Sequence, residues 1–175
     1  MLGLMKTLYL LRHAKSSWDD SSLGDHDRAL NARGRDDAAQ LAEVVAKLEV
    51  PPELVLCSTA KRTRETLQLV MPGPAKVPTE FRERLYLASA VTLLAAIQGI
   101  DEWRQSVMLV GHNDGLHHVA RGLVSSGNAD AARRLYQKLP TCGFIHLSFT
   151  APNWAAIAPE SGKLERFITP RFAED

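Results

Sequence analysis

The sequence predicts an α/β protein, a three-layer α/β/α sandwich on a mainly parallel central sheet. Three observations predict this class. Short apolar runs of strand length recur along the chain, most are followed by a segment with apolar residues at helical spacing, and prolines or glycines separate several of them. This alternation is typical of a parallel sheet that helices cover on both faces. The 175 residues suit one hydrophobic core, so we expect a single domain over residues 1–175.

The first elements each have their own pattern. Residues 7–11 form an apolar run that predicts a strand buried on both faces. Residues 16–30 are polar and acidic and predict a long loop, which at this length is usually functional or mobile. Asn31 suits the N-cap of a helix, and prolines stop that helix at residues 51–52. The apolar residues at helical spacing in between are Ala38, Leu41, Ala42, Val45 and Leu48.

The middle of the chain continues the alternation. Residues 54–57 predict a second short strand, and Ser58 is the expected cap of a helix over residues 59–70. Residues 75–87 predict a short strand and a loop, and residues 91–100 predict a helix. The remaining expected elements are a strand over 106–110, helices over 116–124 and 129–139, and strands over 144–149, 154–157 and 163–168, with a turn at Gly162 between the last two.

Composition limits the functional classes. The formal net charge is only +1, which gives no indication of a general nucleic-acid or membrane-surface role. The two cysteines, Cys57 and Cys142, form no disulfide framework, so we expect free thiols and a cytoplasmic protein. The apolar stretch near the N-terminus is interrupted by Arg12 and is too short for a secretory signal.

Basic side chains follow three of the predicted strands. Arg12 and His13 come directly after the first strand, Arg62 follows the second, and His112 follows the strand over residues 106–110. In open parallel sheets, ligands bind beyond the carboxyl ends of the strands. We therefore expect these four side chains to meet at one edge of the sheet.

The residue types indicate an anion site with a nucleophile. A neutral imidazole such as that of His13 is a good nucleophile, and nearby arginines would disfavour its protonation. Cations in the first turn of a helix oppose the helix dipole, and a bound anion beside Arg62 would offset that conflict. Each motif also has a structural interpretation: an Arg-His pair can simply end a strand, and a charge run is usually a solvated helix turn.

A metal site receives less support. His112, Asp114, His117 and His118 could be drawn as a zinc set, but their spacing does not match a two-histidine arrangement on one helix face. We therefore expect neither a metal nor a cofactor.

Three motifs together resemble a known family. Arg12-His13, Ser58-x-x-x-Arg62 and Gly111-His112, each after a strand, resemble the histidine phosphatase superfamily, which is also called phosphoglycerate mutase-like. The phrase "LRHAKSSW", with Asp27-Arg28-Ala29-Leu30 downstream, is most similar to the short SixA-like phosphohistidine phosphatase branch. The resemblance implies that His13 attacks phosphorus and carries the phosphoryl group. It also implies that Arg12 and Arg62 bind its oxygens, that His112 donates a hydrogen bond to it, and that water hydrolyses the intermediate.

The sequence departs from the mutase pattern at several places. Ala14 and Lys15 replace the Gly-Glu pair of mutase-type members, and Asp19 replaces an asparagine. We therefore expect Lys15 and Asp19 to influence which substrate binds. Leu87 stands where larger branches place an acidic proton donor, and Glu83 lies nearby at a different spacing.

The missing acid predicts a substrate class. An alkoxide leaving group depends on a general acid, which is typically worth about 10²–10⁴-fold in rate. An imidazole leaving a P–N bond, or an acidic aryl alcohol, needs less help. We therefore expect phosphohistidine on a protein, another phosphoramidate or an aryl phosphate, rather than a sugar phosphate. An aspartate between residues 19 and 27 is a further candidate for the acid, and whether the loop over residues 16–30 closes over substrate is open.

Other interpretations of the sequence stay open. The same residues would serve a non-catalytic phosphate-binding regulatory module, or a phosphomonoesterase or mutase acting on a small metabolite. A nucleotide-binding domain is disfavoured because neither a Gly-x-Gly-x-x-Gly nor a Walker-type motif follows a strand. The expected partner is a phosphorylated protein or a small phosphorylated substrate, with no nucleic acid and no membrane, and the oligomeric state is open.

Overall fold

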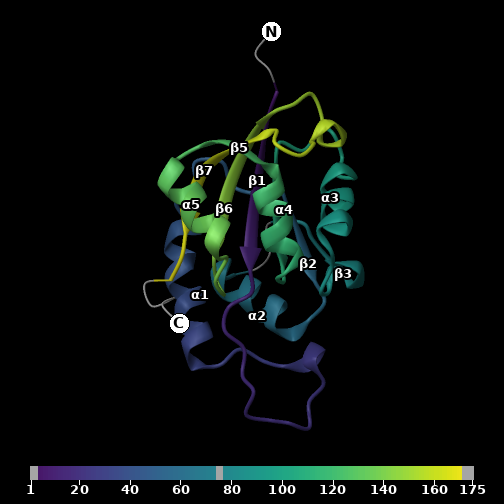
Figure 1. Cartoon of the computed structure of the whole chain (residues 1–175). Helices are drawn as coiled ribbons and strands as arrows, with labels where there is room; N and C mark the ends of the chain where they lie inside the picture. Colours follow the sequence, from purple (N-terminus) through teal and green to yellow (C-terminus); the bar gives the residue numbers. More distant parts are fainter. Residues whose placement is uncertain (1–3, 74–76, 171–175) are drawn as a thin grey trace.

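A computed structural model describes residues 4–73 and 77–170 of the chain. Figure 1 shows a central sheet with helices packed against it. The strands are β1 (Met5–Arg12), β2 (Leu54–Ser58), β3 (Thr79–Arg82), β4 (Ser106–Gly111), β5 (Val124–Gly127), β6 (Phe144–Thr150) and β7 (Gly162–Ile168). The α-helices are α1 (Ala32–Val45), α2 (Lys61–Val70), α3 (Ala90–Gln98), α4 (Gly115–Leu123) and α5 (Ala129–Gln137). Three short 3₁₀ helices are η1 (Asp25–Asp27), η2 (Glu83–Leu85) and η3 (Trp154–Ala156).

The sheet has seven strands in the order β3-β2-β4-β1-β6-β7-β5. Strand β6 runs antiparallel to both of its neighbours, and the other four strand pairs are parallel. The expected mainly parallel sheet is therefore confirmed. The sheet directs the carboxyl ends of β1, β2 and β4 to one edge, and the loop after β1 extends beyond that edge (Figure 1).

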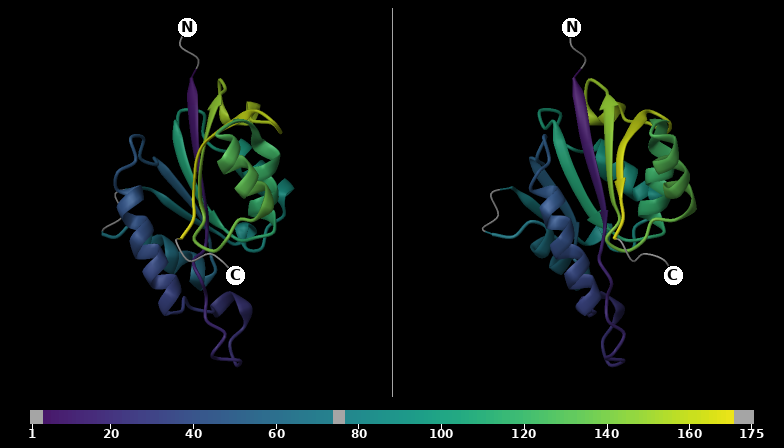
Figure 2. Two further views of the ribbon diagram at one scale, coloured as in Figure 1. Left: turned by 60° about the vertical axis from the view of Figure 1, so that its left-hand side comes forward. Right: turned by 90° about the vertical axis from the view of Figure 1, so that its left-hand side faces the viewer.

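Each face of the sheet carries its own apolar cluster, which confirms the three layers. Along β1, Leu8 and Leu10 belong to the cluster that includes residues of α3, α4 and α5. Tyr9 and Leu11 point to the opposite cluster, with residues of α1 and α2. The alternation follows from the strand geometry, because successive side chains point to opposite faces. Figure 2 shows the sheet between the two helical layers.

Two expected caps have different outcomes. Asn31 caps α1 as expected, since its Oδ1 accepts a hydrogen bond of 2.8 Å from the amide of Gly34. The expected Ser58 cap of α2 is wrong. Helix α2 begins at Lys61 with Ala60 at its N-cap position and no capping side chain. Ser58 is still part of β2, and its hydroxyl points to another partner that is described below.

The C-terminal third differs most from the expectation. Residues 154–157 form no strand, because the chain turns there into η3, which Asn153 caps by accepting from the amide of Ala156. The indole of Trp154 is fully buried and donates to the carbonyl of Arg104. The sequence also did not predict β5, a four-residue strand that pairs with β7, and Gly162 begins β7 instead of marking a separate turn.

No helix among the described residues is long and apolar enough to cross a membrane.

Candidate active site

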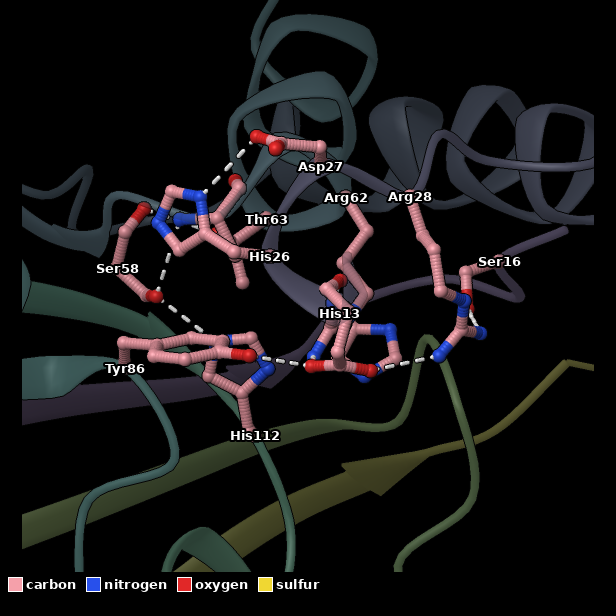
Figure 3. Close-up of polar contacts among 12 residues, drawn as sticks. His13, Ser16, His26, Asp27, Arg28, Ser58, Arg62, Thr63, Tyr86 and His112 are labelled. Atoms are coloured by element: carbon pink, nitrogen blue, oxygen red, sulfur yellow. Dashed lines mark hydrogen bonds and ion pairs between the residues drawn. The ribbon is translucent and has the colours of Figure 1, made fainter. Parts of the chain in front are cut away.

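The structure brings together the four side chains that the sequence singled out. Arg12 ends β1 opposite Gly111, the last residue of β4, and the amide of His13 donates to the carbonyl of Gly111. The residues that follow these strand ends therefore lie side by side. The ring centroids of His13 and His112 are 5.3 Å apart (Figure 3).

His13 is held as a neutral imidazole with one free nitrogen. Its Nδ1 lies 2.7 Å from the carbonyl oxygen of Ala14. A carbonyl only accepts, so Nδ1 carries the proton and Nε2 keeps its lone pair. Burial, aided by the charges of Arg62 and Arg12, lowers the pKa of His13 to about 3, although the bond to Ala14 acts in the opposite direction. At neutral pH the Nε2 lone pair is therefore available to an electrophile.

His112 is buried even more deeply, with 2% of its surface exposed. Its Nε2 lies 2.8 Å from the hydroxyl of Ser58, while its Nδ1 is buried without a hydrogen-bond partner. Burial, followed by the neighbouring His13 and Arg62, lowers the pKa of His112 to about 3. This histidine is therefore also neutral at physiological pH.

Arg62 is the buried cation of the charge run in α2. It is 3% exposed, whereas Lys61 and Arg64 in the same helical turn are exposed to solvent. Arg64 lies over the ring of Phe81 in β3, 5.5 Å from its centroid. The structural interpretation of this run as a wholly solvated turn is wrong for Arg62.

Arg12 contributes a second guanidinium at the same edge. Its Nη1 donates to the carbonyl of Leu139 over 2.8 Å, and its Nε is buried without a hydrogen-bond partner. Arg12 and Arg62 are both close enough to His13 to lower its pKa, so the nitrogen with the lone pair lies in a positive environment. Such an environment favours an anion with several oxygens.

Asp25 joins this cluster from the loop after β1. Its backbone carbonyl and its Oδ2 accept from Arg62 over 2.6 Å and 2.9 Å, and its Oδ1 accepts from Arg28 over 2.8 Å. The hydroxyl of Tyr86 donates to Oδ2 over 2.5 Å. Hydrogen bonds from Tyr86, Arg62 and Arg28, the first being the strongest, lower the pKa of Asp25 to about 2. A carboxylate ionised at neutral pH holds no proton to donate.

Tyr86 is a residue that the sequence did not single out. It follows η2 and packs edge-on against the ring of His112, with centroids 5.4 Å apart. It packs in the same manner against His26, whose Nε2 lies 3.0 Å from the hydroxyl of Thr59. The ring of Tyr86 therefore lies against both His112 and His26. The signal in the sequence was its place directly before Leu87, the position where larger branches of the family have an acidic proton donor.

The structure does not bring Lys15 and Asp19 into this cluster. Both are exposed, and the amide of Asp19 bonds within its own loop to the hydroxyl of Ser17. Glu83 and Leu87 are exposed as well. The influence of Lys15 and Asp19 on substrate choice therefore stays a prediction.

Among residues 4–73 and 77–170, no group of three or more histidine, cysteine or acidic residues is placed to hold a metal ion. The zinc set drawn from the sequence does not form, since the Nε2 of His117 bonds to the carbonyl of Leu135 over 2.6 Å. Cys57 and Cys142 are free and buried, and burial raises the pKa of each thiol to about 12.

A family model and several known proteins match the chain. Residues 8–89 match the family model "Histidine phosphatase superfamily (branch 1)". The uncharacterized protein ML1117 of Mycobacterium leprae is 39% identical over 166 residues, which are 92% of this chain and 100% of that protein. An uncharacterized chloroplastic protein of Arabidopsis thaliana, At3g52155, is 33% identical over 96% of this chain and 79% of its own length.

Two solved structures are similar over nearly the whole chain. The putative phosphohistidine phosphatase SixA from Agrobacterium tumefaciens has a TM-score of 0.79 at 30% identity and covers 94% of this chain and 98% of its own. The putative phosphohistidine phosphatase SixA from Nakamurella multipartitia has a TM-score of 0.83 at 26% identity, over 95% and 97%.

Proposed function

Because the chain belongs to the histidine phosphatase superfamily, in its SixA-like branch, we propose that it hydrolyses a phosphoryl group through a phosphohistidine intermediate on His13. One observation carries this proposal. The Nε2 of His13 keeps a lone pair at neutral pH and lies among two arginines and a second buried histidine. A nucleophile among cations that bind phosphoryl oxygens is what phosphoryl transfer requires of a protein.

The first step forms a P–N bond. The Nε2 lone pair of His13 attacks phosphorus in line, the bond from phosphorus to the leaving group breaks, and the leaving group departs with the electron pair. Arg12 and Arg62 bind the phosphoryl oxygens and stabilise the charge that develops on them. Because Nδ1 keeps its proton, the phosphorylated ring is an imidazolium, and the Ala14 carbonyl accepts its N–H.

The second step regenerates the enzyme. Water attacks the phosphorus of the intermediate, the P–N bond breaks, and its electron pair returns to Nε2. The ring becomes the neutral imidazole again and inorganic phosphate is released. The buried environment favours this return, because burial disfavours the positively charged ring.

The substrate class follows from proton supply. Asp25, the carboxylate that accepts from Arg62, is ionised at neutral pH, and Leu87 and Glu83 are exposed outside the cluster. Without a carboxylic acid, a substrate whose leaving group departs readily is favoured. We propose phosphohistidine on a protein as the substrate, with another phosphoramidate or an aryl phosphate as the next candidates.

Turnover on three substrates tests this proposal. A phosphohistidine peptide and p-nitrophenyl phosphate are expected to be hydrolysed faster than a sugar phosphate, and His13→Ala is expected to abolish turnover and phosphoenzyme formation. Faster hydrolysis of the sugar phosphate than of both others would refute the substrate class. Phosphate binding by the wild type without turnover on any substrate would indicate a phosphate-binding module instead.

We also propose that the reaction is independent of metal ions, because the arginines supply the positive charge that a metal would otherwise provide. Full activity after exhaustive treatment with a chelator is the expected result. Activity that is lost with the chelator and restored by adding a divalent cation would contradict it.

A further inference from the structure

The hydroxyl of Ser58 and the two ring nitrogens of His112 form an isolated hydrogen-bonding group in the interior. Ser58 has no exposed surface and His112 is 2% exposed, so water reaches neither side chain freely. The Oγ of Ser58 lies 2.8 Å from Nε2 of His112 and accepts a long bond of 3.4 Å from the amide of Ala60. The Nδ1 of His112 has no partner.

A neutral imidazole carries one proton, so two arrangements are possible. In the first, the Nε2–H of His112 donates to Ser58, and Nδ1 presents a lone pair. In the second, the Ser58 hydroxyl donates to Nε2, and the proton sits on Nδ1. The arrangement decides whether Nδ1 repels or attracts an anion.

Counting hydrogen bonds separates the two arrangements. Within the described ranges, the hydroxyl hydrogen of Ser58 has one acceptor in reach, the Nε2 of His112. If Nε2 donated instead, that buried hydroxyl hydrogen and the Nδ1 lone pair would both be unpaired. If Ser58 donates, only the Nδ1–H is unpaired. A buried polar group without a partner costs about 1–3 kcal/mol, so the arrangement with fewer such groups is favoured.

The unpaired nitrogen also faces the other residues of the site. In Figure 3 the Ser58 contact lies on one side of the His112 ring, and the other nitrogen lies on the side of His13 and Arg62. An N–H in that position completes the ring of donors around a phosphoryl group, beside two guanidinium groups.

We infer that Ser58 is a positioning residue for the reaction: its hydroxyl donates to Nε2 of His112 and thereby holds the proton on Nδ1, where the N–H binds a phosphoryl oxygen. The inference rests on the proposed function for its last step. It also accounts for the failure of Ser58 to cap α2, because the hydroxyl points across to β4 and the residue after it.

The tautomer of His112 is measured directly by NMR of protein with ¹⁵N-labelled histidine, at pH 7. We expect a protonated Nδ1 and an unprotonated Nε2 in the wild type, with the resonances assigned by comparison with His112→Gln. A proton on Nε2 in the free protein and in its vanadate complex would overturn the inference. This measurement does not depend on turnover, so its failure is distinct from failure of the proposed function.

Variants at Ser58 test the consequence. Ser58→Ala is expected to weaken the binding of vanadate about 10- to 100-fold, the value of one hydrogen bond to a charged group, and Ser58→Thr is expected to restore most of it. The matched control is Ser106→Ala. Ser106 is 1% exposed and begins β4 at its far end, where its hydroxyl donates to the carbonyl of Pro51.

The readouts separate positioning from stability. Ser106→Ala is expected to lower the melting temperature and leave vanadate affinity unchanged. Ser58→Ala is expected to shift His112 toward the Nε2-protonated form as its affinity falls. Two results would contradict the inference. One is an unchanged vanadate affinity in Ser58→Ala, and the other is a lower affinity without any change in which nitrogen of His112 carries the proton.

Discussion

At the residue scale, Asp25 shows how the site organises its charges. Its carboxylate accepts from Arg62, Arg28 and Tyr86, so the arginine that we assign to phosphate binding is held by an internal anion. Arg62 uses one N–H of each terminal nitrogen for Asp25 and its backbone carbonyl. A guanidinium has five N–H donors, and these two bonds with Asp25 use two of them. Asp25 therefore orients the guanidinium of Arg62 without using all of its N–H donors.

The depressed pKa of Asp25 predicts how stability depends on pH. The folded-state pKa of about 2 lies below the ordinary 3.8, so the ionised form stabilises the fold above pH 4. That stabilisation is lost as the pH falls from about 4 to about 2. Urea unfolding of the wild type and Asp25→Asn is expected to show a gap in unfolding free energy that is largest at pH 5 and narrower at pH 3.

Tyr86→Phe provides the matched comparison for Asp25. The hydroxyl of Tyr86 is the largest contributor to the low pKa of Asp25, so its loss moves that pKa back toward 3.8 and flattens the acid limb of the stability profile. A gap between the wild type and Asp25→Asn that stays constant from pH 5 to pH 3 would show that the carboxylate is not linked to folding in this way.

The two buried histidines predict an absence of titration. Burial lowers the pKa of His13 and of His112 to about 3, whereas an unperturbed imidazole titrates near 6.5. Their ring ¹⁵N resonances, assigned with His13→Gln and His112→Gln, are expected to stay unchanged between pH 8 and pH 5. A midpoint between pH 6 and pH 7 for either ring would place that histidine in a solvated environment.

How far the sequence reveals the site depends on where each residue lies. His13 and His112 directly follow regular strands and Arg62 lies in the helix after a third, and strand ends in a parallel sheet converge, so their meeting was predictable. Asp25 and Tyr86 lie in a long loop and after a 3₁₀ turn, where no periodicity fixes a position. Their contacts come from tertiary packing, which a pattern in the sequence does not encode.

At the scale of elements, the N-terminus of α1 is packed closely against the segment after β1. A Cβ added at Gly34 would lie 2.8 Å from the amide nitrogen of Lys15 and closer still to its carbonyl oxygen. Both atoms are backbone and cannot rotate away. The absence of a side chain at Gly34 therefore allows α1 to support the strand end that carries His13.

Gly34→Ala is expected to destabilise the fold by about 1–3 kcal/mol, the usual cost of overpacking a closely packed site. Gly122→Ala is the control, because Gly122 also lies in a helix but has nothing within 4 Å of an added Cβ. That variant is expected to be neutral or up to about 1 kcal/mol more stable, since alanine is the better helix former. Equal changes in the unfolding free energy of the two variants would show that the close contact with Lys15 does not cause the destabilisation in Gly34→Ala.

The elements that the sequence predicted correctly are the ones with strong internal patterns. The strand over residues 106–110 and the helix that Asn31 caps have clear apolar patterns and a clear start signal. The short edge strand β5 contains two serines and is mostly exposed, so it has no buried face to produce a pattern. Residues 154–157 are apolar because Trp154 fills the core, and the sequence alone does not separate that reason from strand formation.

At the scale of the whole molecule, the sheet couples two apolar clusters into one structure. Leu10 and Leu11 are neighbours in β1, both fully buried, and they face opposite clusters. If residues 1–175 form a single domain, as we propose, loss of either cluster unfolds both. The central strand is then the element through which the two layers share their stability.

Leu10→Ala and Leu11→Ala are each expected to lower the unfolding free energy by about 2–5 kcal/mol, with one cooperative transition in both variants. Tryptophan fluorescence and far-UV circular dichroism check this, because Trp154 is buried in the cluster that contains Leu10 and not in the one that contains Leu11. Coincident transitions are the expected result for both variants. If the fluorescence transition of Leu11→Ala occurs apart from its circular dichroism transition, the chain consists of two units that unfold independently.

The turn before β6 has a consequence for motion. The amide of Arg12 donates to the carbonyl of Gly143, and the carbonyl of His13 accepts from the amide of Cys142. On the other side of the strand, the amide of His13 donates to the carbonyl of Gly111. The backbone at His13 is thus hydrogen-bonded to both neighbouring segments, and its amide is expected to exchange with deuterium only when the sheet opens. Substrate arrival then requires no ordering of this backbone.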